Sequence, residues 1–133
     1  MEEKLIPDPC LLGPLQLAYI GDAVYEIYVR NYLLSNGNIN SSRLQQRAEK
    51  LVKAQAQHEA LQIIAPLLNE EECRIVHRGR NQKHKSKPKN ATVQEYNSAT
   101  GLESLVGYLY LHRLLNRLDE IIQTIFNETC QDV

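Results

Sequence analysis

Apolar residues recur at steps of three and four along almost the whole chain, and no segment shows the sustained alternation of a half-buried strand. This periodicity predicts helices and argues against a sheet-based fold. The first helix is expected from about residue 14 to 34, because proline at position 14 suits a first helical turn. The apolar stripe that should face the core on this helix consists of Leu17, Ile20, Val24, Ile27 and Tyr28.

Capping residues mark the starts of the later helices. Asn40 or Ser41, Asn69 and Thr92 can each accept a hydrogen bond from the first turn of a helix, and Thr92 belongs to a capping box. We therefore expect a single all-α domain, residues 1–133, with about five to seven helices. The later helices should cover approximately residues 41–64, 69–78, 92–115 and 118–129.

The composition is that of an ordinary soluble globular protein, with 43% hydrophobic residues, 23% charged residues and a net charge of -1. No apolar run approaches the roughly 18 residues that a membrane span needs. The three cysteines are odd in number and none belongs to a CxxC pair, while the four histidines lack metal-ligand spacing. We expect a cytoplasmic protein with free thiols, no zinc and no membrane contact.

Basic residues are concentrated in one segment, which we expect to be a loop at about residues 78–91. Seven of the fifteen Lys and Arg residues lie between Arg74 and Lys89, and no acid occurs from Cys73 to Gln94. Pro88 disfavours a helix there. Such a cationic loop suits a polyanion, and nucleic acid is the commonest polyanion in a cell, but a merely solvated loop has the same composition.

Two acids lie among small and apolar residues inside predicted helices. Asp22 follows Gly21 in L-A-Y-I-G-D-A-V-Y-E, and Glu103 lies between Gly101 and Gly107 in A-T-G-L-E-S-L-V-G-Y-L-Y-L. A carboxylate in such surroundings is costly unless it is paired or bound to a ligand. Glycine is unfavourable inside a helix by about 1 kcal/mol, which indicates that another backbone approaches closely.

A crossing of these two helices at their glycines would bring Asp22 and Glu103 together. Paired carboxylates hold a hard cation such as Mg²⁺, and a metal-bound water can attack a phosphodiester. The alternative is structural: each acid caps a helix or pairs with an arginine.

Both segments resemble the signature motifs of the ribonuclease III family, and the short Mini-ribonuclease III branch resembles the chain most closely. L-A-Y-I-G-D-A-V-Y-E is similar to the first signature, usually written E-F-L-G-D-A, and A-T-G-L-E-S-L-V-G-Y-L-Y-L is similar to the second, usually D-x-x-E-A-L-I-G-A-x-Y-L. The order, the helical setting and the separation of the motifs agree, and the resemblance covers most of the chain.

The resemblance implies that Asp22 and Glu103 bind a catalytic Mg²⁺, with Asp22 essential for cleavage. Two other acids of the family motif are absent, since their positions fall on Ala18 and Thr100. These losses reduce the negative charge around the metal. Glu26, one turn beyond Asp22, and Thr100 are candidates for a second shell around the ion.

The resemblance also implies an all-helical homodimer that cleaves double-stranded RNA, with one cleavage centre in each subunit. Because the chain has no separate RNA-binding domain, the basic loop should contact phosphates itself. The substrate implied is the precursor of 23S, large-subunit ribosomal RNA, and a large-subunit ribosomal protein is a candidate partner. The residues expected to bind RNA are Arg78, Arg80, Lys83, Lys85, Lys87 and Lys89.

Two other functions remain compatible with the sequence. One is a catalytically inactive ribonuclease-III-like module that binds RNA or the ribosome, which the absent acids at positions 18 and 100 favour. The other is a helical protein-interaction domain whose basic loop meets an acidic protein. A cleavage assay with and without Mg²⁺ separates the first alternative from an enzyme, and affinity for duplex RNA at moderate salt separates the second.

Overall fold

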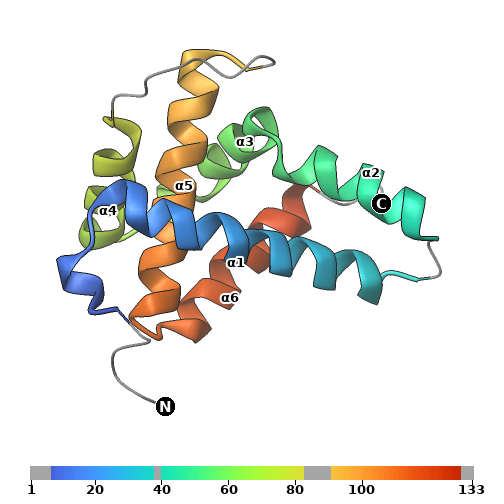
Figure 1. Cartoon of the computed structure of the whole chain (residues 1–133), viewed down its shortest axis with the longest axis horizontal. Helices are drawn as coiled ribbons and strands as arrows, with labels where there is room; N and C mark the ends of the chain where they lie inside the picture. The colour runs from blue at the N-terminus through green and yellow to red at the C-terminus, as the bar shows by residue number, and fades with distance from the viewer. Residues whose placement is uncertain (1–6, 38–39, 83–90, 130–133) are drawn as a thin grey trace.

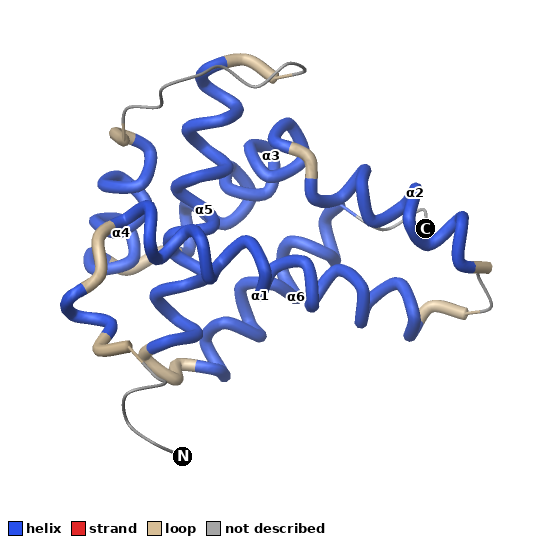
Figure 2. Tube along the Cα trace, in the orientation of Figure 1, coloured by secondary structure: helices blue, strands red, loops and turns tan. Residues whose placement is uncertain are grey.

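The computed structural model describes residues 7–37, 40–82 and 91–129. Within these ranges the chain forms six α-helices, two short 3-10 helices and no strand, so the predicted all-α fold is confirmed (Figures 1 and 2). The α-helices are α1 (Pro14–Ser35), α2 (Ser41–Val52), α3 (Ala54–Ile64), α4 (Glu70–Arg80), α5 (Val93–Leu111) and α6 (Leu115–Thr129), and the 3-10 helices are η2 (Pro9–Leu11) and η3 (Ala65–Leu67).

Helix α5 is the central element, and it packs against α1, α3, α4 and α6. Figure 1 shows α1 running across α5, with α4 and α3 on either side. Leu102, Leu105, Val106 and Leu109 of α5 are completely buried in the core. This helix has an apolar or small residue on nearly every side because it is surrounded by other helices.

The predicted caps are confirmed. The side chain of Asn40 accepts a hydrogen bond from the backbone N–H of Arg43, 3.0 Å away. Thr92 and Glu95 form the expected capping box at the start of α5, and Asn69 caps α4 in the same way. These helix starts depend on side chains only three residues from the groups that they cap, so local sequence is sufficient to locate them.

The prediction of one continuous helix from about residue 41 to 64 is wrong, because the chain breaks between α2 and α3. Lys53 has an extended backbone, with φ -66° and ψ 157°, and it ends one helix and begins the next. The buried side chain of Gln57 donates a hydrogen bond from Nε2 to the carbonyl oxygen of Val52, 2.9 Å away. This bond satisfies a carbonyl that the break frees from the helical pattern.

The expected core stripe of α1 is wrong at one position. Leu17 and Val24 are buried, but Ile27 is 58% exposed, and the buried face includes Ala18 and Gly21 instead. Small residues form the contact face because they allow α5 to approach α1 closely. Hydropathy gives such residues little weight, so the periodicity of large apolar side chains placed the stripe too far round the helix.

Helix α4 extends further than predicted, so Arg78 and Arg80 lie in its last turn and not in a loop.

An ion pair fixes helix α4 to the rest of the fold. Glu72 of α4 is 3% exposed and accepts hydrogen bonds from Nε and Nη2 of Arg117 on α6, each at 2.8 Å. The guanidinium holds the pKa of Glu72 below its ordinary value.

None of the helices in the described ranges has the length and apolar character that crossing a membrane requires.

Candidate active site

The predicted crossing of the two acid-bearing helices is present, and two glycines form it. A Cβ added to Gly21 of α1 would lie 1.8 Å from the carbonyl oxygen of Glu103, and one added to Gly107 of α5 would lie 1.9 Å from the carbonyl oxygen of Leu17. Only glycine permits this contact of two backbones. Gly101, expected at the same crossing, instead packs against α4, where an added Cβ would lie 3.0 Å from the carbonyl oxygen of Val76.

The crossing brings the carboxyl groups of Asp22 and Glu103 into contact, so the convergence expected from the sequence is observed. The two side chains are within hydrogen-bonding reach. Asp22 is exposed to solvent, whereas Glu103 is partly buried between α1 and α3. The pair therefore presents one carboxyl group to solvent and holds the other behind it.

Burial raises the pKa of Glu103 from 4.5 to about 8, and the negative charge of Asp22 and its hydrogen bond add to the shift. Two carboxylates in contact cannot both ionise easily, so Glu103 retains a proton near neutral pH when no cation is bound. A divalent cation that displaced this proton would remove the repulsion. The electrostatics of the pair therefore favour binding of a positive ion.

This shift makes the stability of the cation-free protein depend on pH. Because the folded-state pKa of Glu103 is above its ordinary 4.5, the free energy of unfolding should fall as pH rises from about 4.5 to about 8. We expect a loss of about 2 kcal/mol after allowance for solvent screening. Urea denaturation in EDTA at pH 5.5, 7 and 8.5 measures it. Glu103→Gln should abolish this dependence, whereas Glu26→Gln should retain it; an unchanged pH profile in Glu103→Gln would contradict the prediction.

Gln57 of α3 is a third polar group of the site, and sequence analysis missed it. Its side chain is 2% exposed, and Nε2 lies 3.3 Å from Oε2 of Glu103 as well as 2.9 Å from the carbonyl oxygen of Val52. The hydrogen bond to Glu103 opposes the rise in the pKa of that carboxyl group. Nothing in the local pattern of α3 signals this contact, because it depends on a helix that begins many residues later.

The two candidates for a second shell have other partners in the structure. Glu26 forms an ion pair with Arg30, with 2.8 Å between Oε2 and Nη2. Thr100 is buried, and its hydroxyl donates a hydrogen bond to the carbonyl oxygen of Tyr96 at 3.1 Å. The absent acid at position 18 leaves a buried alanine one turn before Asp22.

Two of the six residues expected to bind RNA can be placed. Arg78 and Arg80 are exposed in the last turn of α4. Gly79 between them packs against Ser104, the neighbour of Glu103, since an added Cβ would lie 2.6 Å from the Ser104 hydroxyl oxygen. The basic end of α4 therefore lies beside the part of α5 that carries Glu103. The other four residues, Lys83, Lys85, Lys87 and Lys89, lie outside the described residues.

The donor set of this site fits a hard divalent cation. Asp22 and Glu103 supply carboxylate oxygens, the ligands that Mg²⁺ prefers, and Gln57 has a buried carbonyl oxygen with no hydrogen-bond donor among the described residues. No group of three or more His, Cys, Asp and Glu side chains suited to a metal occurs in the described part of the chain. Only two carboxylates are therefore present, consistent with an ion that keeps several waters.

Comparison with known proteins agrees with the motifs. The Ribonuclease III domain family matches residues 15–114. The chain is 45% identical over 127 residues to the Mini-ribonuclease 3 of Clostridium tetani, which covers 95% of this chain and 84% of that protein. It is 43% identical over 125 residues to the Mini-ribonuclease 3 of Brevibacillus brevis, covering 94% and 93%.

The fold has also been seen in a relative. The crystal structure of a protein from Fusobacterium nucleatum aligns with a TM-score of 0.81 at 32% identity, covering 89% of this chain and 94% of that chain. Similarity of sequence over nearly the full length and similarity of fold thus lead to the same assignment. This chain belongs to the ribonuclease III family of endoribonucleases, in its Mini-ribonuclease 3 branch.

Proposed function

We propose that this protein is a Mg²⁺-dependent endoribonuclease that hydrolyses phosphodiesters of double-stranded RNA, leaving 5′-phosphate and 3′-hydroxyl ends. The contact between Asp22 and Glu103 is the observation that carries the proposal, because it joins two carboxylates in one site, and the basic end of α4 packs on the neighbouring Gly101 and Ser104 of α5. The resemblance to the Mini branch supports a precursor of 23S, large-subunit ribosomal RNA as the substrate, and a large-subunit ribosomal protein as a partner that presents it.

Each residue of the site has a distinct part in this reaction. Asp22 and Glu103 would hold the cation, and Asp22 also faces the solvent from which RNA arrives. The chemistry that Mg²⁺ supplies when bound is acidification of a water and stabilisation of charge on the phosphate. Arg78 and Arg80 position the duplex by its phosphates, since double-stranded RNA is recognised by shape and backbone more than by base edges.

A direct assay tests the proposal. A long RNA duplex is incubated with the purified protein and Mg²⁺ or EDTA, and the product ends are sequenced. Cleavage with Mg²⁺ alone and 5′-phosphate ends is the expected result. Duplex binding without cleavage would instead indicate the inactive RNA-binding module. No affinity for the duplex at moderate salt would overturn both functions.

The contribution of α4 should be visible in the salt dependence of RNA binding. Each Arg that neutralises a phosphate adds about 0.7 to 0.9 to the slope of log affinity against log salt. Replacing Arg78 and Arg80 with Gln should therefore reduce the slope by about 1.5. Affinity is measured in EDTA at several salt concentrations. Arg74→Gln is the matched control on the same helix, because Arg74 already pairs with Glu71; an equal change in that variant would remove the assignment.

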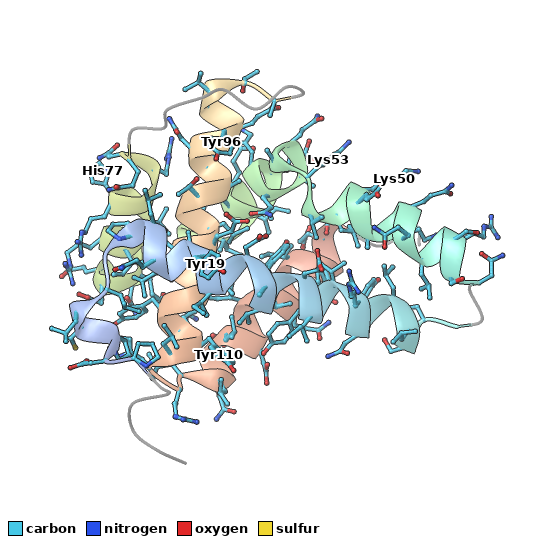
Figure 3. All side chains as sticks on the ribbon, in the orientation of Figure 1. Tyr19, Lys50, Lys53, His77, Tyr96 and Tyr110 are labelled. Carbon is cyan, nitrogen blue, oxygen red and sulfur yellow. The ribbon has the colours of Figure 1, made fainter. Side chains whose placement is uncertain are left out.

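The outer face of α1 supports a homodimer. Leu15, Tyr19 and Ile27 are 46%, 81% and 58% exposed and lie at steps of four or eight, which aligns them along one side of the helix. Figure 3 shows Tyr19 on the face of α1 turned away from α5. A twofold contact through this face would place the Asp22 sites of two subunits on either side of it, which suits cleavage of both strands. The glycines at positions 21 and 107 are already used inside one subunit.

Tyr19→Glu should therefore weaken the dimer by at least about 100-fold, because a charge would be buried at the centre of the contact. Sedimentation equilibrium over a range of protein concentrations measures the dissociation constant. Tyr110→Glu is the comparison, since Tyr110 is 46% exposed on α5 and should leave association unchanged. If Tyr110→Glu weakened the dimer and Tyr19→Glu did not, the subunit contact would lie on α5 instead of α1.

A further inference from the structure

Gln57 has an unusual hydrogen-bonding state for a buried side chain. Both hydrogens of Nε2 are used, one on the carbonyl oxygen of Val52 at 2.9 Å and one on Oε2 of Glu103 at 3.3 Å. Its Oε1 is fully buried and has no hydrogen-bond donor among the described residues. The orientation of the amide is fixed, because exchanging its nitrogen and oxygen would set an oxygen against the Val52 carbonyl.

Burial of a polar amide is unfavourable unless its groups are used, so the placing of Gln57 beside a carboxyl group calls for a physical reason. The amide of Gln57 joins the candidate cation site to the break between α2 and α3. Its partner at the break is Val52, and the next residue, Lys53, has the extended backbone. A simple capping role explains the bond from Nε2 to Val52. It does not explain the second bond, to Glu103.

We propose that Gln57 is a positioning residue for the cation, an inference that rests on the proposed function. Its Nε2 donates a hydrogen bond to Oε2 of Glu103, 3.3 Å away, and so holds that carboxyl group in place from the α3 side. Groups that orient metal ligands commonly change metal affinity by about 10 to 100-fold when they are replaced.

This role also accounts for a site with only two carboxylates. The family motif has acids where this chain has Ala18 and Thr100, and both of these side chains are buried, with the Thr100 hydroxyl donating to the carbonyl oxygen of Tyr96. Gln57 adds a neutral hydrogen-bond donor, Nε2, from a third helix on the α3 side of Glu103. The cation would then be oriented by polar atoms from α1, α3 and α5 together.

Cation binding to the RNA-free protein tests the inference. Mn²⁺ serves as the probe, and its dissociation constant is measured by calorimetry and by the rise in melting temperature that it causes. Gln57→Met has nearly the same size and lacks both polar groups. It should bind Mn²⁺ at least about tenfold more weakly. Gln62→Met, an exposed position on the same helix, is the matched control and should bind as the wild type does.

Gln57→Asn provides a second variant in case the methionine protein fails to fold. It keeps the amide but is one methylene shorter, so it cannot reach Val52 and Glu103 at once, and it should also weaken Mn²⁺ binding. A loss of stability in EDTA with an unchanged Mn²⁺ dissociation constant in either folded variant would show a purely structural role and overturn the inference. Failure of the wild type itself to bind Mn²⁺ would overturn the proposed function as well.

Discussion

Asp22→Asn should retain the helical fold and most RNA binding while the rate of duplex cleavage falls by at least about a thousandfold. A catalytic metal contributes several kcal/mol to the reaction, and about 4 kcal/mol corresponds to that factor. Asparagine has the same shape as aspartate but no charge, so it holds a divalent cation opposite Glu103 much more weakly. Single-turnover cleavage with Mg²⁺, together with binding measured in EDTA, separates loss of chemistry from loss of affinity.

The stability of this variant gives an independent check. Asp22→Asn removes a negative charge that raises the pKa of Glu103, so in EDTA the variant should be at least as stable as the wild type at pH 8. Asp119→Asn on α6 is the matched control: Asp119 accepts a hydrogen bond from Tyr28 and is not one of the acids of the pair, so cleavage should persist. Undiminished cleavage by Asp22→Asn would remove the proposed mechanism.

Gly107→Ala should destabilise the protein by more than about 3 kcal/mol, because its new methyl group would lie 1.9 Å from a backbone oxygen of α1. A backbone atom cannot rotate away as a flexible side chain can, so α1 and α5 must separate. Gly21→Ala meets the carbonyl oxygen of Glu103 at 1.8 Å and should have the same effect. Thermal unfolding should show a fall in melting temperature of about 10 °C or more.

Gly13→Ala is the control for this prediction. Gly13 precedes α1, and an added Cβ there has no atom within 4 Å among the described neighbours. Only the small preference for glycine over alanine at a helix cap is lost, about 1 kcal/mol or less. If Gly107→Ala and Gly13→Ala were equally stable, the close crossing of α1 and α5 would be contradicted.

The sequence by itself determined the helices and the pairing of the two acids. Caps at Asn40, Asn69 and Thr92 act over three residues, so short patterns specify them. The approach of α1 to α5 was also predictable, because glycine inside a helix is costly, and one such glycine precedes Asp22 while another lies one turn after Glu103. The caps are local features, whereas the meeting of α1 and α5 was inferred from what the two glycine-bearing acidic segments share.

Only the tertiary structure decided the surroundings of the pair. The partner of Gly101 is α4 and not α1, the helix from residue 41 breaks at Lys53, and Ile27 faces outwards. Gln57 reaches Glu103 from a different helix, a contact that no periodicity along the chain specifies. The raised pKa of Glu103 likewise comes from burial and from the charge of Asp22, and both exist only after α1, α3 and α5 have packed together.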